Sequence, residues 1–107
     1  MVGLESGGAG RYPGPMPYEQ MSDEALLERI GRCDRAALAA LYDRYAAAVM
    51  TVATLVTGRR AAAEAVVEQL FWSVWRGEIA ADGRVRHHLM LGARQLARAR
   101  VAFPLGG

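Results

Sequence analysis

The sequence predicts an all-α protein, a compact bundle of about four helices. Apolar residues recur at three- and four-residue spacing over long stretches, as on one face of a helix. No stretch alternates apolar and polar residues with the period of two that a strand requires. With 107 residues and 52% hydrophobic content, the chain has the length of one domain and ample material for a core.

Glycine and proline divide the chain into an arm, a helical domain and a tail. Residues 1–21 hold five glycines and three prolines, and we expect a flexible arm without a fold of its own. Tyr12 and Tyr18 lie in this arm, and a solvated tail is the favoured reading. Residues 22–103 form the predicted helical domain, and 104–107 a tail or the start of a linker.

The first predicted helix covers residues 23–32. Ser22 is a suitable N-cap, and Asp23 and Glu24 fall in the first turn, where the helix dipole favours acids. Its narrow apolar stripe consists of Ala25, Leu26, Ile30 and Cys33. Since Cys33 is the only cysteine, it excludes an intrachain disulfide, and we expect a small core residue there.

The second predicted helix, residues 35–57, shows the strongest periodicity in the sequence. Asp34 is its expected N-cap. The apolar positions follow the helical period without a miss: Leu38, Leu41, Tyr42, Tyr45, Val49, Val52, Ala53 and Val56. This helix should therefore supply one whole side of the core.

The third predicted helix covers residues 61–76 and lies between Gly58 and Gly77, which suit helix ends. Its core-facing positions are Val66, Val67, Leu70, Phe71, Val74 and Trp75. Glu64 and Glu68 are one turn apart and form a polar edge with Arg60. This edge is either an ordinary solvated border or a docking surface for a larger protein.

A loop, residues 77–83, ends in an Asp82-Gly83 turn, and the fourth predicted helix runs over 84–103 until Pro104. Its apolar side is thinner and comprises Val85, Leu89, Gly92, Ala93, Leu96 and Phe103. Residues 83–107 contain five arginines and no acid. A mostly basic stripe follows at four-residue spacing: Arg86, Met90, Arg94 and Arg98.

Motifs for catalysis, metal binding and membrane insertion are missing from the sequence. Ser6, Ser22 and Ser73 have no histidine and acid partners at recognisable spacing. His87 and His88 are adjacent, so they point ~100° apart on a helix and cannot share a metal. No glycine loop cradles phosphate, no apolar run reaches membrane-spanning length, and no signal peptide is recognisable. We therefore expect a cytoplasmic protein that is no enzyme and needs no cofactor.

The order of residues resembles region 2 of the extracytoplasmic-function sigma factors of bacterial RNA polymerase. The resemblance covers about residues 22–103 and is carried by Asp23-Glu24-Ala25-Leu26-Leu27, Cys33-Asp34-Arg35-Ala36-Ala37-Leu38, Leu41-Tyr42-Asp43-Arg44-Tyr45, and Ala63-Glu64-Ala65-Val66-Val67-Glu68-Gln69-Leu70-Phe71 with Trp75. It implies a compact helical bundle, in agreement with the helices predicted above.

By this resemblance, the third helix docks on the clamp helices of the largest subunit of core RNA polymerase. The residues implied in that contact are Glu64, Glu68, Gln69 and Phe71. Ala65 stands where the family usually has an acid, and the family's Gln-Glu pair is reversed as Glu68-Gln69.

The resemblance also implies that the fourth helix lies against the promoter −10 element. Leu89, Ala93 and Arg94 match the family pattern there. His88 replaces a tryptophan, Gly92 an isoleucine, Gln95 an asparagine and Ala99 an aspartate. The candidate DNA-binding residues are Arg86, Arg94, Arg98 and Arg100, which suit phosphate rather than base readout.

Three readings of the function stay open on the sequence. The chain is a sigma-type initiation protein that binds core polymerase and promoter DNA. Alternatively, it is a degenerate sigma-like interaction module that binds an anti-sigma factor or another regulator without melting promoters. The third reading is a helical bundle without sigma activity, with exposed Trp72 in a dimer contact.

The family also has a second helical domain, which reads the −35 element. By the resemblance, that domain would follow a linker that begins where this sequence ends.

Overall fold

The structure is a computed structural model that describes residues 17–102. Its elements are the 3₁₀-helix η2 (Tyr18–Gln20) and four α-helices: α1 (Asp23–Ile30), α2 (Arg35–Thr57), α3 (Arg60–Trp75) and α4 (Val85–Ala102). No strand occurs among these residues. The predicted all-α bundle of about four helices is confirmed. The expectations for residues 1–16 and 103–107, Phe103 included, lie outside the described part of the chain.

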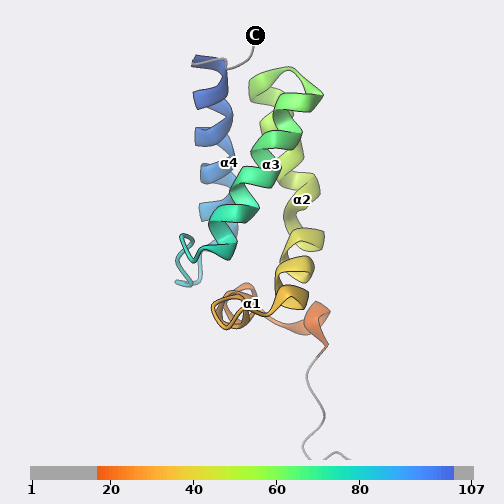
Figure 1. Cartoon of the computed structure of the whole chain (residues 1–107), viewed down its shortest axis with the longest axis vertical. Coiled ribbons are helices and arrows are strands. Elements are labelled where there is room, and N and C mark those ends of the chain that lie inside the picture. The colour runs from red at the N-terminus through yellow and green to blue at the C-terminus, as the bar shows by residue number, and fades with distance from the viewer. Residues whose placement is uncertain (1–16, 103–107) are drawn as a thin grey trace, which may run out of the picture.

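The longest helix, α2, organises the bundle, because α1, α3, α4 and η2 all pack against it. Figure 1 shows α2, α3 and α4 side by side with alternating directions, while α1 crosses the end of the bundle where α2 begins. Short connections at Gly58–Arg59 and at residues 76–84 bring consecutive helices into antiparallel contact.

The core contains the faces that the periodicity predicts. Leu41, Val49 and Ala53 of α2 are fully enclosed. The buried residues of α3 and α4 are Ala62, Ala63, Val66, Val67, Leu70, Phe71, Val74, Val85, Leu89, Ala93 and Ala97. Among these, Ala62, Ala63 and Ala97 were not part of a predicted apolar face. At Gly92, α4 lies close to α3: an added Cβ would lie 2.9 Å from Leu70 Cδ1, so a larger residue there would require the Leu70 side chain to shift.

The two predicted N-caps are confirmed. The Ser22 Oγ accepts a hydrogen bond from the Ala25 amide at 3.0 Å, and Asp34 Oδ1 accepts one from the Ala37 amide at 3.2 Å. These bonds satisfy amides that the first turn of each helix leaves without a partner. At the other end of α2, Gly58 adopts the left-handed conformation with φ 70°.

Helix α1 is shorter than predicted, and the expectation for Cys33 is wrong. The helix ends at Ile30, and residues 31–33 form a turn. Cys33 lies outside the core, exposed, with φ 65°. Its amide donates to the Ile30 carbonyl and the Asp34 amide to the Arg29 carbonyl, the paired bonds of a Schellman motif. A left-handed residue cannot continue the helix, so the predicted apolar stripe stops before it.

The last residues of the predicted arm, 17–21, belong to the fold instead. Met21 is buried in the core, and Tyr18–Gln20 form η2. The Tyr18 hydroxyl donates to Asp34 Oδ2 at 2.7 Å, and this hydrogen bond holds the pKa of Asp34 below its ordinary value. The glycine and proline content of residues 1–21 predicted a flexible arm. The observed contacts could not be predicted from that content, because they depend on residues far along the chain.

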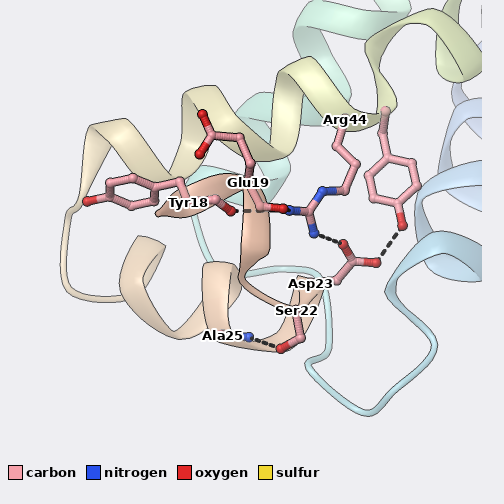
Figure 2. Close-up of polar contacts among 7 residues, drawn as sticks. Tyr18, Glu19, Ser22, Asp23, Ala25 and Arg44 are labelled. Carbon is pink, nitrogen blue, oxygen red and sulfur yellow. Dashed lines mark hydrogen bonds and ion pairs between the residues drawn. The ribbon is translucent and has the colours of Figure 1, made fainter. Parts of the chain in front are cut away.

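A polar cluster connects residues 17–21 and α1 to α2, as Figure 2 shows. Arg44 donates to Asp23 Oδ1 at 2.7 Å and to the carbonyls of Tyr18 and Glu19 at 3.3 and 3.4 Å. The second Asp23 oxygen accepts from the Tyr45 hydroxyl. Burial, together with this hydrogen bond, raises the pKa of Tyr45 to about 12. We call Tyr18, Asp23, Asp34, Arg44 and Tyr45 the α1 cluster.

Candidate functional site

The candidate docking site is an open groove between α2 and α3, with a volume of about 1270 Å³. Its α2 wall comprises Arg35, Leu38, Ala39, Tyr42, Ala46, Ala47 and Met50. Its α3 wall comprises Arg60, Ala61, Glu64, Ala65, Val67, Glu68, Phe71, Trp72 and Trp75. No α4 residue lines it. The groove therefore lies on a different part of the bundle from the basic helix.

Aromatic side chains form the middle and one end of this groove. Tyr42 and Phe71 meet edge to face, with ring centroids 5.0 Å apart. Phe71 is only 6% exposed, whereas Tyr42 is 44% and Trp72 56% exposed. Trp75, predicted to be buried, is half-buried and packs against the core from the groove side. An exposed tryptophan and tyrosine beside a concave apolar wall are the residue types that anchor protein partners.

Charges lie along the α3 rim of the groove. Arg60 Nε donates to Glu64 Oε2 at 3.0 Å, so the predicted polar edge forms and both residues stay exposed. Glu68, one turn further, is exposed and has no ion-pair partner among residues 17–102. The α3 rim thus presents one ion pair and one carboxylate, that of Glu68, without an ion-pair partner in the described part of the chain.

The structure brings together three of the four residues predicted to bind polymerase. Glu64, Glu68 and Phe71 line the groove, and Phe71 offers it little area. Gln69 is exposed but does not line the groove. Ala65, at the position of the missing acid, is half-buried in the groove wall.

The α2 wall is the part of the site that the sequence did not reveal. Tyr42 fits the helical period of α2 and was predicted as core, but it lies at the border of the buried stripe and is exposed. Leu38 and Met50 are half-buried and complete the wall. The sequence contains one indication of this space. The alanines at 46–48 are too small to fill the groove between α2 and α3.

The predicted DNA-binding arginines are all exposed. Arg86, Arg94, Arg98 and Arg100 belong to α4, which contains no acid. None of them forms an ion pair within the described residues. The buried residues of α4, Val85, Leu89, Ala93 and Ala97, have the same four-residue spacing, so the stripe of Arg86, Arg94 and Arg98 runs alongside the buried face over the length of the helix.

At the start of α4, His88 contacts the turn that precedes the helix. Its Nε2 lies 2.9 Å from Asp82 Oδ2, while the Arg84 amide donates to Asp82 Oδ1 at 3.0 Å. The hydrogen bond with His88 lowers the pKa of Asp82. Across residues 17–102, no three His, Cys, Asp or Glu side chains are grouped to hold a metal ion.

Comparisons with known proteins identify no relative. No protein-family model, curated protein or solved structure matches this chain. None of the helices described here has the length and apolar character needed to cross a membrane.

Proposed function

We propose that this protein is a sigma-factor-like protein of bacterial transcription initiation. In this proposal, the groove face of α3 docks on the clamp helices of the largest subunit of core RNA polymerase, and α4 lies along promoter −10 DNA. The protein would act in the cytoplasm by binding and would carry out no catalytic step. The proposal rests on the resemblance in residue order and on one observation: three of the four residues implied in polymerase contact, Glu64, Glu68 and Phe71, line one open groove.

The geometry of α3 supports the protein contact. The helix buries one face in the core and leaves Glu64 and Glu68 exposed beside the concave wall. A docking helix needs this division, because side chains that hold the bundle cannot also reach a partner. The groove is open before any partner binds, so docking requires no rearrangement of the bundle.

The charge of α4 supports the DNA contact. Its exposed arginines have no acid on their own helix, so their charge is available to phosphate. The replacements at positions 88, 95 and 99 remove side chains that the family pattern uses near the bases. We therefore propose phosphate binding with weak sequence preference.

Gel filtration with purified core polymerase tests the protein contact. We expect the wild-type chain to elute with core enzyme and Glu68→Lys to lose most of that binding, because it reverses the free rim charge. Glu28→Lys, a charge reversal at an exposed residue of α1 outside the groove, is the matched control and should bind as the wild type does. Absence of the wild-type complex at low salt would remove the proposal.

Salt dependence tests the DNA contact. Each arginine-phosphate contact contributes about one power of salt concentration to the affinity for duplex DNA. Arg94→Ala combined with Arg98→Ala should lower the slope of log affinity against log salt by about two. An unchanged slope would show that this face of α4 does not bind the DNA backbone.

The alternative is an interaction module that binds an anti-sigma factor or another regulator without initiating transcription. The observation that favours it is Ala65, which leaves the groove wall apolar where the family has an acid. Ala65→Asp discriminates between the two. If Ala65→Asp creates polymerase binding that the wild type lacks, the alternative is correct. If the wild type already binds and Ala65→Asp changes nothing, the sigma-type function is favoured.

A further inference from the structure

The α2–α3 groove carries balanced charges beside its apolar walls. Its charged lining residues are two arginines and two glutamates: Arg35, Arg60, Glu64 and Glu68. Arg60 pairs with Glu64, whereas Arg35 and Glu68 have no ion-pair partner among residues 17–102. Because the four charges cancel, the groove favours neither a strongly basic nor a strongly acidic occupant. A second copy of this chain has the same balance of charge and presents the same surface.

One aromatic contact defines where these charges lie along the groove. The rings of Tyr42 on α2 and Phe71 on α3 have centroids 5.0 Å apart, so the two residues lie at one level of these antiparallel helices (Figure 1). Arg35 precedes Tyr42 by seven residues, and Glu64 precedes Phe71 by seven. At ~1.5 Å per residue, each charge lies about 10 Å from the aromatic level. Since the helices run in opposite directions, Arg35 and Glu64 lie on opposite sides of that level.

A two-fold axis through the aromatic level brings opposite charges together. The axis exchanges the walls, so that α2 of one copy faces α3 of the other. Arg35 of the second copy then comes level with Glu64 of the first, one helical turn from Glu68, and symmetry repeats this pairing. The Glu64 side chains of the two copies are about 20 Å apart along the groove. Glu68 of the two copies lie on opposite walls, about 9 Å apart along the groove.

The same axis places large side chains opposite small ones. Trp72 is 56% exposed and Trp75 is half-buried, and both line the α3 wall. They follow Phe71 in the chain, so the axis brings them over the part of α2 that begins at Tyr42 and continues to Ala46. The alanine at this position leaves space in the wall that an indole ring can fill. Each tryptophan would lose exposed apolar area there, and such burial favours association.

We propose that the free protein forms a two-fold dimer through the α2–α3 groove, with Trp72 near its centre and an Arg35–Glu64 pair at each end. This dimer covers Glu64, Glu68 and Phe71, so it closes the face proposed to dock on polymerase. That consequence rests on the proposed function, whereas the dimer itself does not. Self-association thereby opposes polymerase binding at high protein concentration, and the monomer is the form that binds core enzyme.

Two charge reversals and their mixture test the pairing by sedimentation velocity of the full-length chain. The wild type should form a dimer that dissociates on dilution. Arg35→Glu places like charges opposite each other twice per dimer, as does Glu64→Lys, so each variant alone should dimerise about tenfold more weakly. An equimolar mixture restores opposite charges at both ends of the mixed dimer and should dimerise about as tightly as the wild type. The control Glu28→Lys reverses an exposed charge outside the groove and should leave the dimer unchanged.

Trp72→Ala tests the centre of the dimer. The substitution occurs twice in each dimer, so the dissociation constant should rise about a hundredfold. Leu55→Ala removes an apolar side chain that is 81% exposed and outside the groove, and should change it little. Equal weakening by these two substitutions would overturn the proposal. So would a wild type that stays monomeric at every concentration, or a charge-reversal mixture that dimerises no better than its components.

Addition of core polymerase separates the dimer from the proposed function. If the dimer forms as expected and polymerase binds no form of the protein, the dimer stands and the sigma-type function is wrong. If polymerase binds a wild type that is monomeric throughout, the dimer is wrong and the function stands. Where both hold, polymerase should convert the dimer into a complex with one copy of this chain. A complex that retains both copies would contradict the closure of the docking face.

Discussion

Two sides of α2 show contrasting uses of polar and aromatic side chains. On the side that contacts α1, the α1 cluster is internally satisfied: Asp23 receives hydrogen bonds from both Arg44 and Tyr45. Along the groove, Tyr42 and Trp72 remain exposed, and Glu68 lacks an ion-pair partner among residues 17–102. Similar residue types thus stabilise the fold in one region and remain accessible in the other. The two regions differ in whether these side chains have hydrogen-bond or ion-pair partners among the described residues.

This difference predicts how each region responds to substitution. Removing a member of the α1 cluster leaves its partners without the bonds that offset their desolvation, so the loss appears in folding stability. Removing an exposed groove side chain such as Trp72 breaks few internal contacts, so the loss appears in binding. Measuring stability and binding for each variant therefore tests the assignment of both regions.

The largest stability effect should come from Asp23→Ala. It removes two charge-assisted hydrogen bonds and leaves Arg44 without its carboxylate, so we expect the free energy of unfolding to fall by about 3 kcal/mol. Urea denaturation measures this. Glu28→Ala breaks the exposed Arg32–Glu28 pair and should cost less than about 0.5 kcal/mol. Equal losses in the two variants would show that the α1 cluster is not a stabilising unit.

Alkaline pH should weaken the same cluster. The pKa of Tyr45 is about 12 in the fold against an ordinary value of 10.0, so the folded state keeps a proton that the unfolded state releases. Stability should be fully present below pH 10 and fall by about 2 kcal/mol as the pH rises to 12. Urea midpoints across this range measure the loss. Tyr45→Phe should remove most of the slope, and an unaltered slope would assign it to another group.

A smaller gain in stability is expected at the turn between α1 and α2. Cys33 adopts φ 65°, a conformation that costs a residue with a side chain ~1 kcal/mol or more. The equivalent position after α3 is Gly77, with φ 78° in the same pair of hydrogen bonds. Cys33→Gly should therefore stabilise the protein by about 0.5 kcal/mol in thermal or urea unfolding. Cys33→Val should destabilise it, and a gain from valine would contradict the assignment.

A small stability effect should also come from Trp72→Ala. The side chain is 56% exposed and forms no hydrogen bond with residues 17–102, so the free energy of unfolding should change by less than about 1 kcal/mol. Urea denaturation measures this. A loss of unfolding free energy as large as that expected for Asp23→Ala would mean that the Trp72 side chain stabilises the bundle and is not available to a partner.

The sequence predicted those parts of the fold that depend on neighbouring residues. Helical periodicity located α2 with its observed bounds, and the caps Ser22 and Asp34 follow from side chains next to the amides they bind. The turn at Cys33 could not be predicted, because nothing in its side chain favours φ 65°. The contacts between Tyr18 and Asp34 and between Asp23 and Arg44 also join residues that only the fold brings together.

Of the two walls of the candidate site, the sequence predicted only the α3 wall. Glu64 and Glu68 are recognisable from helical spacing and from the sigma region 2 resemblance. Tyr42 was assigned to the core because its spacing fits the buried stripe. Whether a residue at the border of a stripe is buried depends on how close the neighbouring helix lies, and here the small residues Ala46 and Ala65 leave the groove open. That distance is a property of packing and not of periodicity.

The most direct test of the central assignment is amide chemical-shift mapping of the full-length, ¹⁵N-labelled protein. The clamp-helix fragment of the polymerase largest subunit is added in steps. We expect shifts in the groove walls, above all at Tyr42, Glu68 and Trp72, and unchanged resonances at Asp23 and Arg44. Shifts confined to α1 or α4, or none at a saturating concentration, would contradict the assignment of the α2–α3 groove as the polymerase-docking site.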